Sequence, residues 1–175
     1  MASHLVEINR APVLTLWAAV VAERLGFNWE EALTLGKAVA GLNAQSKGRR
    51  LGIFEPAGEG AEKARRKRAP FHVDLLGRKV PAKNTDDGVR AMNKDRVVDP
   101  QSVRSYLHGK FGDDYGRAKS AMQSLARAFT PKVLAEEAYG LYEELRPDVP
   151  AGKRGWGAKG RLNLQRIRRL ANRGG

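Results

Sequence analysis

The chain of 175 residues carries 32 Lys and Arg against 19 Asp and Glu, so its formal charge is +13 at pH 7. Apolar residues make up 42%, enough for a hydrophobic core, which excludes a chain that is disordered throughout. There is no Cys, which excludes disulfides, thiolate metal sites and Cys nucleophiles and fits a reducing compartment.

The first predicted element is a helix over residues 11–25, which opens with an apolar run. This run has the length of the hydrophobic part of a secretory signal, but Glu7 precedes it and Arg10 is the only basic residue beside it. The run is also too short to cross a membrane. We therefore expect a buried helix, no association with membranes and a cytoplasmic protein.

A second helix is predicted from residue 29 to about residue 43. Gly26 ends the first helix, and Asn28 with Glu31 three positions later has the pattern of a capping box. Two capped helices joined at a glycine turn match the helix-turn-helix pattern. Residues 1–50 are therefore expected to form a helix-turn-helix-like pair.

The start of this second helix fits DNA poorly. A recognition helix enters the major groove by its first turns, which here carry Trp29, Glu30 and Glu31. Two carboxylates beside phosphate are repulsive and normally need compensating arginines close by. We expect that these three residues do not read bases, so the helix pair is either a DNA-binding unit or an element for packing or dimerisation.

The middle of the chain is expected to be mostly helical. Residues 51–70 read as a basic linker or arm, and two stretches after it, around LGRK and NKD, predict short β-hairpins. Asp99–Pro100 and Thr130–Pro131 are pairs of an N-cap and a first helical residue. The expected fold is mainly α, with five or six helices and a small β-hairpin element, in which residues 71–147 pack with residues 1–50 as one core.

Two segments hold the excess positive charge. Residues 47–70 carry eight basic and three acidic side chains, and residues 151–175 carry eight basic side chains and no acidic one. Positive charge concentrated in this way is typical of proteins that bind a polyanion. Residues 148–175 are expected to form a basic tail rich in Gly and Arg, and we expect residues 151–175 of it to carry function more than folding.

The tail is expected to end in a short basic helix. Asn163 is a suitable N-cap, and Leu164, Ile167 and Leu170 fall on one side of the helix that follows. Trp156 is expected to anchor the tail or to stack on a base. The candidate residues for binding nucleic acid are the basic side chains of the arm and the tail together with Trp156: Arg65, Arg66, Lys67, Arg68, Lys153, Arg154, Trp156, Lys159, Arg161, Arg166, Arg168, Arg169 and Arg173.

Motifs for catalysis are weak in this sequence. Residues 155–160 match G-x-G-x-x-G, but no buried strand precedes them and no acid follows them, as a dinucleotide site requires. His4, His72 and His108 are far apart and form no helical metal pair. We expect no cofactor and no metal, and assign no catalytic residue.

Three functional hypotheses follow from the charge distribution. The favoured one is a non-enzymatic protein that binds nucleic acid, duplex DNA in preference to RNA, through phosphate contacts of its basic arms. The alternatives are an adaptor whose basic arms bind an acidic protein, and a nucleic-acid-processing enzyme with a site built from distant residues. A homodimer is left open. Basic segments on one face would favour nucleic acid, and basic segments on opposite faces would favour the adaptor.

Overall fold

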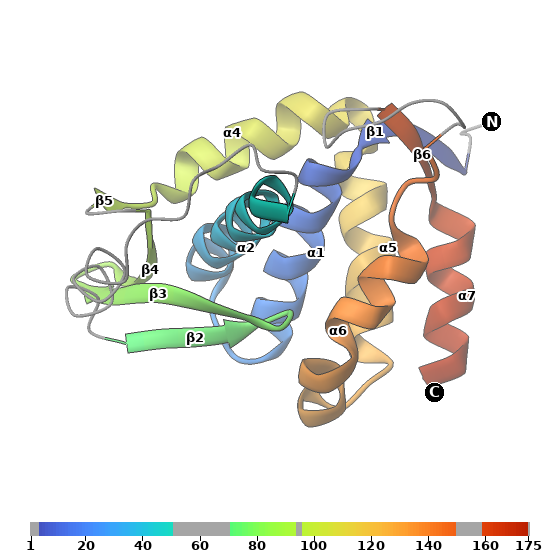
Figure 1. Ribbon diagram of the computed structural model, residues 1–175. Coiled ribbons are helices and arrows are strands. Elements are labelled where there is room, and N and C mark those ends of the chain that lie inside the picture. Colours follow the sequence, from blue (N-terminus) through green and yellow to red (C-terminus); the bar gives the residue numbers. More distant parts are fainter. Residues whose placement is uncertain (1–3, 51–70, 94–95, 150–158, 175) are drawn as a thin grey trace.

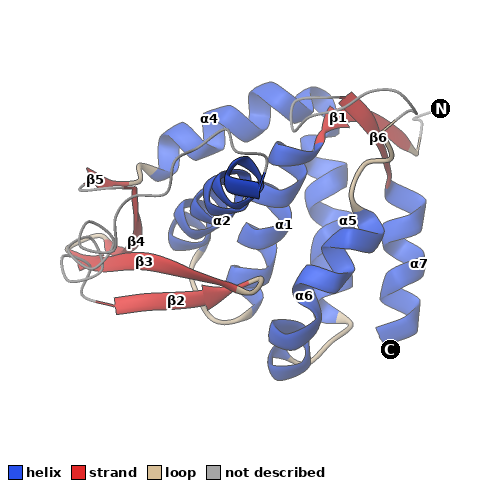
Figure 2. Cartoon of the chain, in the orientation of Figure 1, coloured by secondary structure: helices blue, strands red, loops and turns tan. Residues whose placement is uncertain are grey.

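Helices and strands are mixed along the chain, and the strands form two separate antiparallel sheets (Figures 1 and 2). The structure, a computed structural model, describes residues 4–50, 71–93, 96–149 and 159–174. The elements in order are β1 (Leu5–Asn9), α1 (Arg10–Arg24), α2 (Trp29–Arg50), β2 (Phe71–Leu75), β3 (Arg78–Thr85), β4 (Gly88–Asn93), β5 (Arg96–Val97), α4 (Pro100–Phe111), the 3-10 turn η1 (Gly112–Asp114), α5 (Tyr115–Arg127), α6 (Pro131–Leu145), β6 (Lys159–Asn163) and α7 (Leu164–Gly174).

The larger sheet has the strand order β2-β3-β4-β5 and is a meander of neighbours in sequence. Its first turn, Leu76–Gly77, has positive φ at both residues, 50° and 74°, which matches the type of turn that suits the twist of a two-residue hairpin. Both predicted hairpins are confirmed, since β2 pairs with β3 and β4 pairs with β5.

The second sheet joins distant parts of the chain. In it β1 pairs with β6, so that Val6 lies opposite Leu162 and Glu7 lies opposite Arg161. The predicted fold class, mainly α with a small β-hairpin element, is therefore wrong: the described residues form six strands in two sheets, and the fold is a mix of helix and strand. The sequence of β6 hid this strand, because KGRLN offers a single large apolar residue to a sheet face.

The predicted N-caps of several helices are confirmed by their hydrogen bonds. Asn28 Oδ1 accepts from the Glu31 N–H at 2.9 Å, and Glu31 Oε1 accepts from the Asn28 N–H at 2.9 Å, which completes the capping box. Asp99 and Thr130 cap α4 and α6 by accepting from main-chain N–H groups. These bonds form because each joins residues two or three positions apart, so the local sequence is sufficient to specify them.

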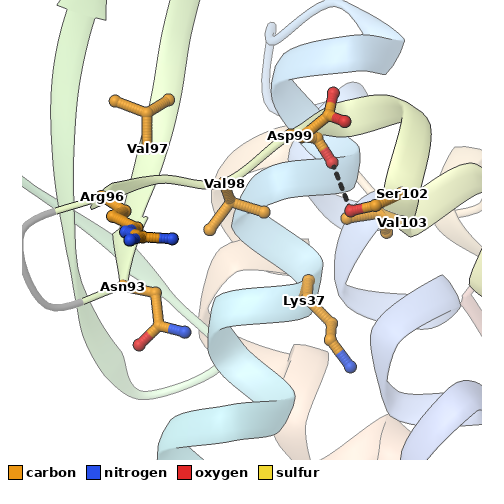
Figure 3. Close-up of a pocket in the computed structure, with 8 residues that line it drawn as sticks. All are labelled: Lys37, Asn93, Arg96, Val97, Val98, Asp99, Ser102 and Val103. Carbon is orange, nitrogen blue, oxygen red and sulfur yellow. Dashed lines mark hydrogen bonds between the residues drawn. The ribbon is translucent and has the colours of Figure 1, made fainter.

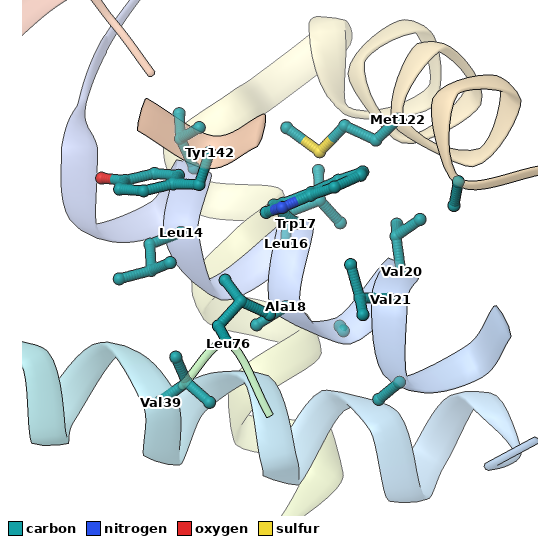
Figure 4. Packing of buried hydrophobic residues seen from close by; sticks show 14 of the residues in the cluster. Leu14, Leu16, Trp17, Ala18, Val20, Val21, Val39, Leu76, Met122 and Tyr142 are labelled. Atoms are coloured by element: carbon teal, nitrogen blue, oxygen red, sulfur yellow. The ribbon is translucent and has the colours of Figure 1, made fainter. Parts of the chain in front are cut away.

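Helix α1 is the centre of the core, and the run from Pro12 to Ala22 is buried without interruption. It packs against α2, α4, α5 and α6, which is why it shows no polar face. Figure 4 shows the Trp17 ring among the core side chains of these helices, and its Nε1 donates to the Ala138 carbonyl at 2.9 Å. Gly36 lets α1 and α2 approach closely, since a Cβ there would lie 2.4 Å from the Thr15 carbonyl oxygen.

The described part of the tail belongs to the core. Leu162, Leu164, Ile167 and Leu170 are all buried, and α7 packs along α5. Asn163 is the N-cap, as predicted, and accepts from the N–H groups of residues 165 and 166. Residues 159–174 therefore contribute to the fold, contrary to expectation, while the function of the tail stays a prediction.

Candidate nucleic-acid interface

More than half of the candidate residues cannot be placed. Those outside the described residues are Arg65, Arg66, Lys67, Arg68, Lys153, Arg154 and Trp156. Arg173 lies in the last turn of α7, but its side chain is also outside the described part. The structure therefore places the side chains of Lys159, Arg161, Arg166, Arg168 and Arg169.

The outward face of α7 is basic. Leu164, Ile167 and Leu170 turn toward the core, which leaves residues 165, 168, 169 and 172 exposed. Among the described residues, Arg168 and Arg169 form no hydrogen bond or ion pair. The helix that carries them packs on α5 and their side chains are exposed, so their guanidinium groups are available to an outside anion.

Arg166 differs from its neighbours on α7. Its Nη1 and Nη2 donate to Asp148 Oδ1 and Oδ2 at 3.3 and 2.8 Å. These hydrogen bonds, and then the charges of Arg166, Arg10 and Arg146, hold the pKa of Asp148 below its usual range, although its partial burial acts in the opposite direction. The predicted stripe of Arg166, Arg169 and Arg173 is thus divided, because its first member is already paired.

The exposed face of β6 carries Lys159 and Arg161. Across the strands, Arg161 stands between two acids: Glu7 is its partner on β1, and Asp148 is its partner in a bridge on the other side. Opposite charges that face each other across strands attract, so part of the charge of Arg161 is offset within the protein. Lys159 lies opposite Asn9 and has no acid as its cross-strand partner.

The start of α2 is occupied by the larger sheet. Glu31 Oε2 accepts from the Val89 N–H at 2.8 Å, and Thr34 Oγ1 accepts from the Ala91 N–H at 3.0 Å. Arg90 is 5% exposed and pairs with Glu30 at 3.5 Å. The first turns of α2, which a helix-turn-helix protein would place in the major groove, therefore contact β4 instead.

A cleft of about 560 Å³ lies between α2, the β4–β5 hairpin and the start of α4 (Figure 3). Asn93 and Arg96 are cross-strand partners on one wall, and Lys37 stands on the other. The Lys37 amine lies 4.0 Å from the centre of the Tyr106 ring, and its burial there, followed by the charge of Lys110, lowers the pKa of Lys37. The remaining lining residues are Val97, Val98, Asp99, Ser102 and Val103, so the cleft includes none of the candidate residues.

The two basic segments lead into different sheets of the molecule. The first leads into β2 of the larger sheet, and the second leads into β6 of the smaller one. Figure 1 shows these sheets at opposite ends, with α1, α5 and α6 between them. The strands into which the two segments lead, β2 and β6, therefore do not lie at one end of the molecule.

Among the described residues, no helix has both the length and the apolar character that a membrane span requires. In the same part of the chain, no group of three or more His, Asp or Glu side chains is arranged to hold a metal ion. Comparisons with protein-family models, with curated proteins and with solved structures find no match to this chain.

Proposed function

We propose that this protein binds nucleic acid, duplex DNA in preference to RNA, through phosphate contacts and without catalysing a reaction. The observation that carries the proposal is the outward face of α7, where Arg168 and Arg169 are exposed without a partner among the described residues. Guanidinium groups bind phosphate oxygens in a planar, two-pronged geometry. Because α7 is packed into the core, little backbone order is lost when its arginines bind.

The charge around this face supports the same proposal. Residues 159–174 hold six basic side chains and no acidic one. Two acids are paired with cations of this face: Glu7 and Asp148 are strand partners of Arg161, and Asp148 also forms an ion pair with Arg166. The other described cations, Lys159, Arg168 and Arg169, have no paired acid. Binding to a polyanion through these cations releases condensed counterions, so affinity should fall steeply with salt.

Sequence selectivity is expected to be weak. Phosphate contacts position a protein on a duplex, whereas contacts to base edges select the sequence. The one element whose pattern matches a base-reading helix, α2, is covered by β4 at its first turns. The proposed interface therefore consists of cations on a strand and a helix, without a base reader among the described residues.

The test is a titration of two unrelated duplexes at several salt concentrations. Replacing Arg168 and Arg169 by Gln should reduce the slope of log K against log salt by about 1 to 2 units, because each phosphate neutralised by the protein adds roughly 0.9 to that slope. The matched control replaces Lys83 and Lys132, exposed cations on β3 and α6, and should leave the slope unchanged. Equal effects of the two double variants would show that only net charge matters and would contradict an interface on α7.

An adaptor function is the second candidate, and one observation favours it. The two basic segments lead into sheets at opposite ends of the molecule, a geometry that suits bridging between acidic surfaces better than binding along one duplex. The titration separates the two proposals. Absence of duplex binding at low salt would exclude the nucleic-acid function and favour the adaptor.

A further inference from the structure

Two arginines from distant parts of the chain bind the segment Pro147–Asp148, and a third, Arg146, directly precedes it. Arg10 is the first residue of α1, Arg146 follows α6, and Arg166 lies in the first turn of α7. Arg166 holds both oxygens of Asp148, while Arg10 Nε donates to the carbonyl of Pro147, the residue between Arg146 and Asp148, at 3.2 Å.

The single negative charge of Asp148 does not neutralise the three arginines Arg10, Arg146 and Arg166. The charges of Arg10, Arg146 and Arg166 all lower the pKa of the one carboxylate, so three arginines and one acid give a local charge of about +2 before the neighbouring strand is considered. On that strand Arg161 adds a further cation, and Glu7 opposite it adds an anion. The site is open to water, since the side chains of Asp148 and Arg166 are 68% and 38% exposed. An excess of cations at an accessible point favours a second anion.

A buried donor without a partner lies on α6, four residues before Arg146. The Tyr142 hydroxyl has no hydrogen-bond partner in the described structure, although Tyr142 is only 1% exposed. Tyr142 is one helical turn before Arg146, whose N–H donates to the Tyr142 carbonyl, so both side chains lie on one face of α6. In Figure 4 the Tyr142 hydroxyl points away from Trp17.

The same arginines influence the electrostatics of Tyr142. Burial raises the pKa of Tyr142, while the positive charges of Arg10 and Arg146 act in the opposite direction. The group is protonated at neutral pH and has a proton to donate. A buried hydroxyl without an acceptor is destabilising, and an anion held by Arg10 and Arg146 would supply the acceptor.

We propose that Arg10, Arg146 and Arg166, together with the Tyr142 hydroxyl, form a binding site for a phosphate group, for which the Asp148 carboxylate acts as an internal substitute. A phosphate carries more acceptor oxygens than a carboxylate, so it satisfies more of these donors at once. The phosphate belongs either to free inorganic phosphate or to a nucleic-acid backbone. In the second case the inference extends the proposed function, but the site itself does not depend on it.

The test measures binding of inorganic phosphate and of a duplex by calorimetry. Asp148→Asn removes the competing carboxylate and should tighten phosphate binding roughly two- to fivefold, the range for an exposed ion pair. Arg146→Gln should weaken it. Weaker binding by Asp148→Asn would show that Asp148 only positions Arg166, and unchanged binding by both variants would show that the cluster holds no phosphate; either result overturns the proposal.

Tyr142→Phe gives an independent readout. Without ligand this variant should melt at the same temperature as the wild type or higher, because the hydroxyl that it removes has no partner. Addition of phosphate should raise its melting temperature less than that of the wild type. The matched control is Tyr139→Phe on the same helix, which should respond to phosphate like the wild type. Equal shifts in all three proteins would contradict a role for Tyr142.

The two ligands separate the sources of the phosphate and the two proposals. A response of duplex affinity to Asp148→Asn and Arg146→Gln assigns the phosphate to nucleic acid, and a response to inorganic phosphate alone assigns it to the free ion. If Arg168 and Arg169 govern duplex binding while the cluster variants change neither ligand, this inference fails and the proposed function stands. If phosphate binds and no duplex does, this inference stands and the proposed function fails.

Discussion

Glu31 joins the turn between α1 and α2 to the larger sheet, because one carboxylate oxygen caps Asn28 and the other accepts from the Val89 N–H at 2.8 Å. Gly88 allows this contact: its φ is 117°, and a Cβ there would lie 2.9 Å from the Glu31 carboxylate. A glutamate that the capping pattern assigns to one helix start therefore also fixes a β-strand 58 residues away.

Glu31→Ala should destabilise the protein by about 2 kcal/mol, since it removes a capping bond and leaves a main-chain donor of β4 without its acceptor. Glu31→Gln is the graded comparison, because its one oxygen can serve only one of the two donors, and its effect should be smaller. Urea unfolding of both variants measures the free energies. An effect of Glu31→Ala below that of Glu137→Ala, an exposed glutamate on α6, would contradict the link to the sheet.

The two acids at the start of α2, Glu30 and Glu31, lead to a prediction about DNA binding. Glu30→Gln combined with Glu31→Gln should leave non-specific duplex binding unchanged or strengthen it, because the variant removes two negative charges and no group that touches a base. Selection of binding sites from a random pool measures any preference. Loss of a sequence preference in this variant would show that α2 reads bases.

Gly36 and Gly41 form a matched pair on α2. Gly36→Ala should destabilise by about 2 kcal/mol or more, because its methyl group would meet the Thr15 carbonyl and the Ala19 N–H and force the two helices apart. Gly41→Ala should stabilise by roughly 0.5 to 1 kcal/mol, because nothing lies within 4 Å of its Cβ position and alanine favours the helix. Similar thermal shifts for both variants would show that α1 and α2 do not pack closely at Gly36.

The tail should be required for folding. Deletion of residues 159–175 removes β6 and α7 and should abolish the cooperative melting transition, because Val6, Ile8 and the face of α5 lose their cover. Ile167→Ala is the milder test and should destabilise by about 2 to 5 kcal/mol, whereas the exposed Arg168→Ala should change stability by less than about 0.5 kcal/mol. Cooperative melting of the truncated protein at the wild-type temperature would refute this prediction.

Asp148 should add a small pH-dependent stability. Its folded pKa is depressed, chiefly by its hydrogen bonds from Arg166, so its contribution is complete above the unfolded pKa of about 3.9 and is lost as the pH falls through the folded value. The pair is exposed, so we expect less than about 1 kcal/mol. Asp148→Asn should therefore be less stable than the wild type at pH 7 and equally stable near pH 2. A difference in stability between the wild type and Asp148→Asn that grows as the pH falls would contradict this prediction.

Local signals in the sequence predicted local structure well. The caps at Asn28, Asp99, Thr130 and Asn163 all form, and so do both hairpins of the larger sheet, because each depends on residues close in sequence. The sheet of β1 and β6 was missed, since its register links residues 5–9 to residues 159–163 and neither strand reveals its partner.

The candidate site was predicted only in part. Exposure of Arg168 and Arg169 follows from the helical spacing of their apolar neighbours, which the sequence shows. The acids beside Arg161 and Arg166 could not be found, because they arrive through strand register and through the turn after α6. The binding roles of the arm, of Trp156 and of the other cations outside the described residues stay predictions.

The pairing of β1 with β6 sets an order of events during synthesis. At roughly 5 to 20 residues per second, β6 leaves the ribosome on the order of ten seconds or more after β1. Until then α1, buried along its whole centre in the finished protein, lacks part of its cover, and β1 has an open edge. Contacts this distant in sequence also form slowly. The nascent chain is thus a natural client for a chaperone that holds apolar segments, and slow translation of the stretch between β1 and β6 would lengthen its exposure to aggregation.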